Sequence, residues 1–239
     1  MSDLVSLTIS AHGGMDRWRQ LRTVAAHLRV GGALWGLKGK EGLVGDVDFE
    51  ADLHRERASF RPFQAPDRRA AFTPDRVALE TTAGAVLEER RDPRASFAGH
   101  TQDTPWDHLQ AAYFAGYAMW TYLTVPFLLA YPGVETEEMG TWQEAGQTWR
   151  RLKVRFPAGI ATHSTEQVFY FDDRGLLQRH DYDVEVSGGA PGAHYVSGYE
   201  ACSGVMIPTQ RRVFPRQPDG TPLPEPLLVS IDLSHVVFS

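Results

Sequence analysis

The stretch Leu109–Tyr131, LQAAYFAGYAMWTYLTVPFLLAY, decides how this chain folds. It lies within His108–Val134, 27 residues that contain no aspartate, glutamate, lysine or arginine. An apolar run of this length is long enough to cross a bilayer, which takes about 20 residues. However, Pro126 interrupts the run, and no lysine or arginine lies near its ends, between Arg94 and Arg150. A helix buried inside the protein is therefore favoured over a transmembrane helix.

A helix is expected to begin at Thr104 and to run to about Leu123. Thr104 suits the N-cap, and Pro105 suits the first helical position, where its missing N–H would have no partner. Asp107 then places a carboxylate near the positive end of the helix. Pro126 must end or kink the helix, so the hydrophobic helix region is assigned to residues 104–131. Its apolar residues fall on more than one face, so we expect it to be covered on several sides by a sheet or a ligand.

Strand-like segments lie on both sides of this helix region in the sequence. Val47, Phe49 and Ala51 alternate with acidic residues, a period of two that is typical of a strand with one dry face. Other segments are rich in aromatic and β-branched residues and are separated by short turn signals. These candidate strands are Ala58–Phe63, Arg69–Thr73, Arg76–Thr82, Val86–Arg90, Trp149–Phe156, Glu166–Phe171, Leu176–Val186, Ala193–Ala201, Val205–Phe214 and Leu227–Phe238.

Short connections between successive strands favour antiparallel neighbours. The sequence therefore predicts an α+β fold that is mostly antiparallel β, either a single curved sheet or a half-open β-barrel. About eleven strands would wrap around the helix region, which also solves the problem of exposed sheet edges. Residues 1–22 are expected to form N-terminal helices, and residues 1–239 are expected to form a single domain.

Composition excludes several classes of function. The 239 residues carry a net charge of −6, which argues against a nucleic-acid binder, and 42% of them are hydrophobic, as in ordinary globular proteins. The single cysteine, Cys202, excludes an internal disulfide and a cysteine-based zinc site. The N-terminus lacks a positively charged region followed by an apolar run, so we expect a cytoplasmic protein.

Two segments resemble ligand sites in composition but not in spacing. The glycines between Gly31 and Gly45 match neither phosphate-binding pattern, GxxxxGK[ST] or GxGxxG. The acidic residues from Asp46 to Asp52 alternate along a strand, which spreads them rather than gathering them around calcium, so ion pairs with neighbouring strands are favoured. We therefore expect no metal and no cofactor.

Histidines and a tyrosine of the late strands are the candidates for catalysis: His163, His180, His194 and Tyr182. Alternation places His180 and Tyr182 on the drier face of their strand. Neither a metalloprotease HExxH motif nor a GxSxG nucleophile elbow accompanies them. A hydrogen-bonded pair, a polar anchor for a ligand and an acid–base site all remain open.

Aromatic residues crowd the helix region and the late strands. They would either fill the core or line a cavity, and the mouth of a barrel is a common place for an apolar pocket. In the second case the ligand-contacting residues are expected to be Tyr113, Tyr117, Trp120, Phe169, Phe171, Gln178, His180 and Tyr182.

Several short motifs resemble those of the LolA/LolB-like lipoprotein-carrier superfamily. The motifs are Ala11-His12-Gly13-Gly14 followed by Trp18 and Leu21, Phe169–Asp172 followed by Gly175–Leu177, Gly204–Thr209, and Leu228–Asp232. The resemblance implies a half-open antiparallel barrel with helices on its concave side. It also implies that the cavity binds acyl chains of lipoproteins or other hydrophobic molecules.

These observations favour a non-enzymatic binder of a lipid or another hydrophobic small molecule, with neither a nucleic-acid partner nor a transmembrane span. One alternative is an enzyme that acts on a small hydrophobic substrate in the same cavity through the histidines and Tyr182. Another is a protein-interaction module that presents the aromatic helix to a partner.

Overall fold

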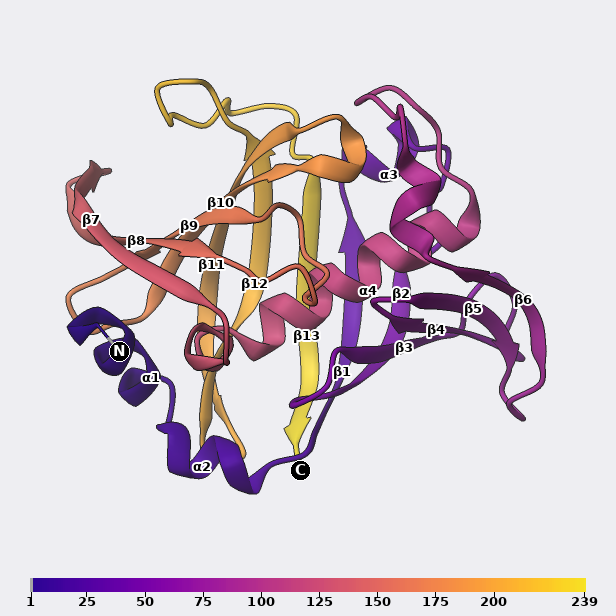
Figure 1. Ribbon diagram of the computed structural model, residues 1–239, viewed down its shortest axis with the longest axis horizontal. Helices are drawn as coiled ribbons and strands as arrows, with labels where there is room; N and C mark the ends of the chain where they lie inside the picture. Colours follow the sequence, from indigo (N-terminus) through magenta and orange to yellow (C-terminus); the bar gives the residue numbers. More distant parts are fainter. Residues whose placement is uncertain (1) are drawn as a thin grey trace.

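Two antiparallel meanders join to form one curved sheet in the computed structural model, which describes residues 2–239 (Figure 1). The strand order is β6-β5-β4-β3-β2-β1-β13-β12-β11-β10-β9-β8-β7. The meanders meet where the first strand pairs with the last, with Leu28 opposite Leu233. The strands are β1 Thr23–Gly31, β2 Asp46–Asp52, β3 Arg57–Arg61, β4 Arg68–Thr73, β5 Arg76–Thr81, β6 Val86–Arg91, β7 Glu135–Glu144, β8 Gln147–Arg155, β9 Glu166–Phe171, β10 Leu177–Val184, β11 Ala190–Cys202, β12 Val205–Pro215 and β13 Val229–Phe238.

The mostly antiparallel curved sheet is confirmed, but it has thirteen strands rather than about eleven, and it is not closed. Strands β1 and β7 are both missing from the candidate segments named above. The reason is clear for β7. It lies at the end of the sheet, and most of its side chains are exposed, so its sequence lacks the apolar alternation that marks a half-buried strand.

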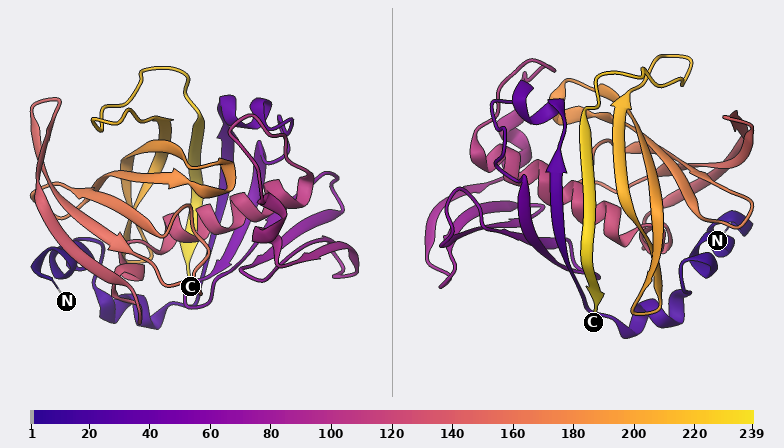
Figure 2. Two further views of the ribbon diagram at one scale, coloured as in Figure 1. Left: turned by 45° about the horizontal axis from the view of Figure 1, so that its top comes forward. Right: turned by 180° about the vertical axis from the view of Figure 1, so that it is seen from behind.

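Within residues 2–239, three short helices lie at the ends of strands, and one longer helix crosses the concave side of the sheet (Figure 1). They are α1 Asp3–Ala11, α2 Met15–Gln20, α3 Ala33–Leu37 and α4 His108–Thr124, with 3₁₀ turns η1 Pro93–Phe97, η2 Phe127–Ala130 and η3 Glu185–Ser187. The helices expected within residues 1–22 are α1 and α2, and Met1 lies outside the described residues. Viewed from behind, the central strands lie in front of α4 (Figure 2).

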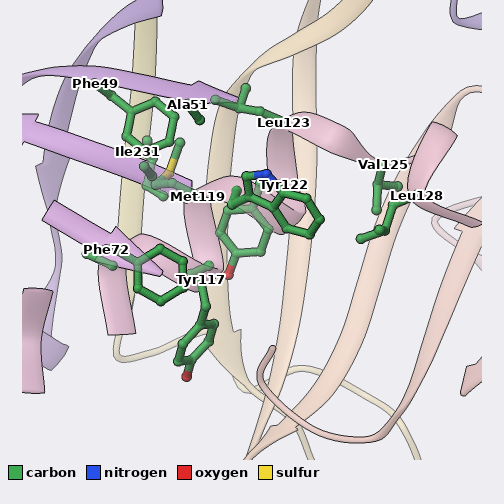
Figure 3. Packing of buried hydrophobic residues seen from close by; sticks show 14 of the residues in the cluster. Phe49, Ala51, Phe72, Tyr117, Met119, Tyr122, Leu123, Val125, Leu128 and Ile231 are labelled. Atoms are coloured by element: carbon green, nitrogen blue, oxygen red, sulfur yellow. The ribbon is translucent and has the colours of Figure 1, made fainter. Parts of the chain in front are cut away.

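Helix α4 is buried along its whole length from Leu109 to Thr124. Its side chains pack among those of β2, β4 and β13 (Figure 3). Within residues 2–239, no helix has the length and apolar character needed to cross a membrane. Because α4 is covered, it does not offer the partner surface that the interaction-module hypothesis requires.

The expected start of this helix at Thr104 is wrong. Asp107 is the N-cap: its Oδ1 accepts from the Gln110 N–H at 2.8 Å, while its own N–H donates to Gln110 Oε1 at 2.9 Å. A distant residue holds the preceding segment out of the helix. The Lys38 Nζ donates to the carbonyls of Gln102 and Thr104, at 2.6 and 3.2 Å.

Strand β4 approaches α4 most closely at Gly116. A Cβ atom built there would overlap the ring of Phe72, so the missing side chain allows the helix to pack directly on the sheet. In a helix interior, alanine is normally more favourable than glycine by about 0.8–1 kcal/mol.

We expect Gly116→Ala to reverse that preference and to destabilise the protein by about 1–3 kcal/mol, because it overpacks the core. The matched control is Gly36→Ala in α3, where a Cβ atom meets nothing within 4 Å. This control is expected to be neutral or slightly stabilising. Urea unfolding of both variants measures the difference, and equal stability of Gly116→Ala and the wild type would contradict the packing argument.

Candidate functional site

An apolar cleft of about 400 Å³ opens at one end of the sheet. Its walls come from segments that are far apart in the sequence and meet at the upper edge of Figure 1. Leu37 and Leu223 lie at its mouth and are 47% and 40% exposed. The other lining residues are Leu34, Gln102, Phe114, Tyr182, Val184, Ser187, Ala190, Pro191, Gly192, Val213, Pro215, Pro226, Leu228 and Val229.

A small internal void of about 30 Å³ lies between α4 and the concave face of the sheet. Phe114, Tyr182 and Val229 line both the cleft and the void, so these residues separate the two. The void has room for about one water molecule. A larger hollow of about 460 Å³ has a different character, because charged residues such as Asp48 and Arg61 line it.

The residues expected to contact a ligand are distributed between this cleft and the core. Tyr182 lines the cleft. Gln178 is half-buried and donates to Asp172. The remaining residues are buried and do not line the cleft: Tyr113, Tyr117, Trp120, Phe169, Phe171 and His180. Their direct contact with a ligand stays a prediction.

The sequence interpretation missed Phe114 and the loop residues around Leu223 as lining residues. Phe114 belongs to the aromatic group of the helix region, and nothing local distinguishes it from its neighbours. A leucine within the proline-rich loop 215–226 was the available signal, since apolar side chains in loops often mark a binding surface.

Behind Tyr182 lies a buried network of hydroxyl and imidazole groups. The Tyr122 hydroxyl lies 2.8 Å from His163 Nε2 and 2.8 Å from the Tyr182 hydroxyl. The Tyr117 hydroxyl lies 3.3 Å from the other ring nitrogen of His163. The rings of His163 and Tyr182 stack, with centroids 3.9 Å apart. The structure thus brings two of the catalytic candidates into contact.

The other two candidates, His180 and His194, face each other across β10 and β11, with ring centroids 5.9 Å apart. His180 Nε2 lies 2.5 Å from Gln167 Oε1, whereas neither ring nitrogen of His194 has a hydrogen-bond partner among residues 2–239. All four candidates therefore gather around Tyr122. Of the four, only Tyr182 lines the cleft.

Burial keeps these histidines neutral. Burial and, to a smaller degree, the nearby Arg94 charge together lower the pKa of His163 to about 3. Burial also lowers the pKa values of His180 and His194 far below the usual value, and the Arg211 charge acts in the same direction. A general acid–base catalyst works best with a pKa near the working pH, so this cluster suits hydrogen bonding better than proton transfer.

The described residues do not form a candidate metal site. Among residues 2–239, no three histidine, cysteine, aspartate or glutamate side chains are grouped so that they could hold an ion.

Comparisons with known proteins identify the fold. No protein family model matches the sequence, and no curated protein matches it. A LolA superfamily protein from Nitrosomonas europaea is 9% identical with a TM-score of 0.51, and the match covers 97% of this chain and 93% of that one. A domain from Vibrio parahaemolyticus described as an outer membrane lipoprotein-sorting protein is 11% identical with a TM-score of 0.52, over 98% and 92% of the two chains. The chain therefore has the LolA-like fold that its short motifs indicated.

Proposed function

We propose that the protein binds a lipid chain or another hydrophobic small molecule in the apolar cleft. The observation that carries this proposal is the cleft itself, which exposes Leu37 and Leu223 and has a volume of about 400 Å³. Small-molecule sites usually have volumes of roughly 300–1,000 Å³ and mainly apolar walls. The structural likeness to a lipoprotein-sorting domain agrees with the same chemistry.

Burial of apolar ligand surface would supply the binding free energy, at about 25 cal/mol per Å² before the costs of ordering the ligand. The ligand would cover the exposed leucines at the mouth and contact Tyr182 and Phe114 at the inner end. Acid–base catalysis by His163, His180 and His194 has weaker support, because these residues lie behind the cleft rather than in its lining.

Filling the cleft should block binding. We expect Ala190→Trp to weaken binding of a fluorescent fatty-acid probe at least tenfold, because Ala190 lines the cleft and the indole would occupy its volume. The matched control is Ala201→Trp, an exposed position near the other end of the same strand, which should bind like the wild type. Probe titrations at equal protein concentration measure both variants.

Mass spectrometry of organic extracts from the purified protein provides a second readout. Wild-type protein should retain a hydrophobic molecule that Ala190→Trp protein lacks. Absence of probe binding to the wild type, or equal binding to the two tryptophan variants, would refute the assignment of the cleft as the binding site.

A further inference from the structure

Arg211 is a buried cation for which residues 2–239 provide no counter-charge. It projects from β12 toward α4 and is 1% exposed. Its Nη2 donates to the Tyr122 carbonyl at 2.9 Å, and its guanidinium lies 5.0 Å from the centre of the Tyr122 ring. Its Nε has no hydrogen-bond partner, and no carboxylate within residues 2–239 forms an ion pair with it. Arg179 is buried to the same degree, but it is paired with Asp181.

His194 lies beside Arg211 and is also unsatisfied. Its register partner in β12 is Val213, two residues from Arg211, so the two side chains are diagonal neighbours on one face, roughly 7–8 Å apart at their Cα atoms. The His194 and Tyr122 rings are in contact, with centroids 4.4 Å apart. Arg211 and His194 thus contact the same tyrosine and leave three buried ring or guanidinium nitrogens without partners.

Leaving these buried groups unpaired is unfavourable unless a bound ligand pairs with them. A buried charge without a partner is costly, and a buried donor without an acceptor loses the hydrogen bonds that it made with water. The pKa of Arg211 reflects this cost, because burial lowers it to about 10. An anion that entered this position would offset the cost through charge-assisted hydrogen bonds to the guanidinium.

The geometry connects this pair to the cleft. Ile231, the register partner of Arg211 in β13, lines the internal void, and so does Tyr122. The void in turn meets the cleft at Phe114, Tyr182 and Val229. Arg211 and His194 do not line the void themselves, but their neighbours Tyr122 and Ile231 do. A chain that enters from the cleft and displaces the side chain of Phe114 or Tyr182 would bring its end group to these neighbours of Arg211.

We infer that Arg211 and His194 form an anion subsite that holds the carboxylate of an amphipathic acid, such as a long-chain fatty acid, whose chain lies in the cleft. This inference rests on the proposed function and specifies its ligand class. A carboxylate fits better than a phosphate, because the void of about 30 Å³ admits only a small group and the planar guanidinium matches a planar carboxylate.

The test compares a fluorescent long-chain fatty acid with its methyl ester, which has the same chain but no charge. We expect wild-type protein to bind the acid at least tenfold more tightly than the ester at pH 7.5. In Arg211→Met the acid should bind as weakly as the ester, while the affinity for the ester stays unchanged. Arg211→Lys retains the charge and should keep part of the preference for the acid.

The matched control is Arg212→Met, the same substitution one residue along β12. Arg212 points to the other face of the strand and pairs with Asp232 at 2.6 Å, so this variant should keep the full preference for the acid. If Arg211→Met does not fold, the comparison of acid and ester on wild-type protein still tests whether the site prefers an anion.

The outcomes separate the two proposals. Equal affinities of the wild type for acid and ester would overturn the anion subsite and leave an uncharged hydrophobic site. Binding of neither probe would overturn both the proposed function and the subsite. A preference for the acid that survives in Arg211→Met but disappears in Arg212→Met would place the anion on the outer face and overturn the subsite.

Discussion

Lowering the pH from 7.5 to 5.0 is expected to reduce the free energy of unfolding by several kcal/mol. His163, His180 and His194 have folded-state pKa values below the ordinary value of 6.5, because burial disfavours their charged forms. Below pH 6.5 the unfolded chain therefore binds protons that the folded chain does not bind. Each histidine then lowers stability by about 1.4 kcal/mol per pH unit until the pH reaches its folded-state pKa.

Two buried carboxyl groups oppose this effect. Burial raises the pKa values of Glu56 and Asp181, so the folded chain takes up these protons first, and stability from these groups increases as the pH falls. Burial also lowers the pKa of a fourth histidine, His12, to about 4. Four histidines therefore outweigh two carboxyl groups, and the net change is a loss. For His163 the loss continues down to its folded-state pKa of about 3.

The variant His194→Leu isolates one histidine. It removes a ring that has no hydrogen-bond partner within residues 2–239, so we expect little loss of stability at pH 7.5. The pH profile should be shallower by about 1.4 kcal/mol per unit between pH 6 and 5. The control is His235→Asn, because His235 is exposed and asparagine tolerates its positive φ of 51°. Urea unfolding at several pH values gives the profiles. A wild-type stability that is constant from pH 7.5 to 5.0 would contradict the role assigned to the buried histidines.

Replacing Arg179 with methionine should cost about 3–5 kcal/mol of stability, because the buried Asp181 carboxylate then keeps only the longer contact with Arg216, at 3.7 Å. The Arg179 side chain is fully buried and donates to both carboxylate oxygens of Asp181, at 2.6 and 2.8 Å. It also donates to Glu144 at 2.7 Å and to the Gly220 carbonyl at 2.5 Å. One guanidinium thus joins β10, β7 and the loop that follows β12.

This substitution should also weaken ligand binding, because the loop held at Gly220 supplies Leu223 and Pro226 to the cleft. The control is Arg174→Met, whose side chain is 72% exposed and pairs with Asp172, and which should change stability by at most about 0.5 kcal/mol. Urea unfolding and titration with the fatty-acid probe measure the two effects. Equal stability of both methionine variants would be incompatible with the assigned role of Arg179.

Local sequence patterns predicted the elements whose burial follows a regular pattern along the chain. The uncharged run His108–Val134 predicted a buried helix, and α4 is buried from Leu109 to Thr124. The alternation of Val47, Phe49 and Ala51 predicted β2, whose alternate residues are buried. Strand β7 escaped prediction because most of its residues are exposed and its sequence shows no alternation of apolar and polar residues.

Contacts between distant residues account for the remaining differences. Thr104 and Pro105 form a reasonable helix start by themselves, but Lys38 binds the Thr104 carbonyl, and the backbone N–H of Trp106 donates to the Lys38 carbonyl. These contacts hold the segment before Asp107 outside the helix. No local signal reveals them, because Lys38 lies far away in the sequence.

By itself, the sequence determined that this chain buries an aromatic helix within an open, mostly antiparallel sheet, because an uncharged apolar run must leave water and short turns pair successive strands. Only the tertiary structure decided which apolar residues remain uncovered. Phe114 and Phe169 are both phenylalanines in aromatic-rich segments, yet Phe114 lines the cleft while Phe169 stacks on His180 in the core. Burial depends on neighbours that are far away along the chain, and among the described residues none of those neighbours gives Arg211 a counter-charge.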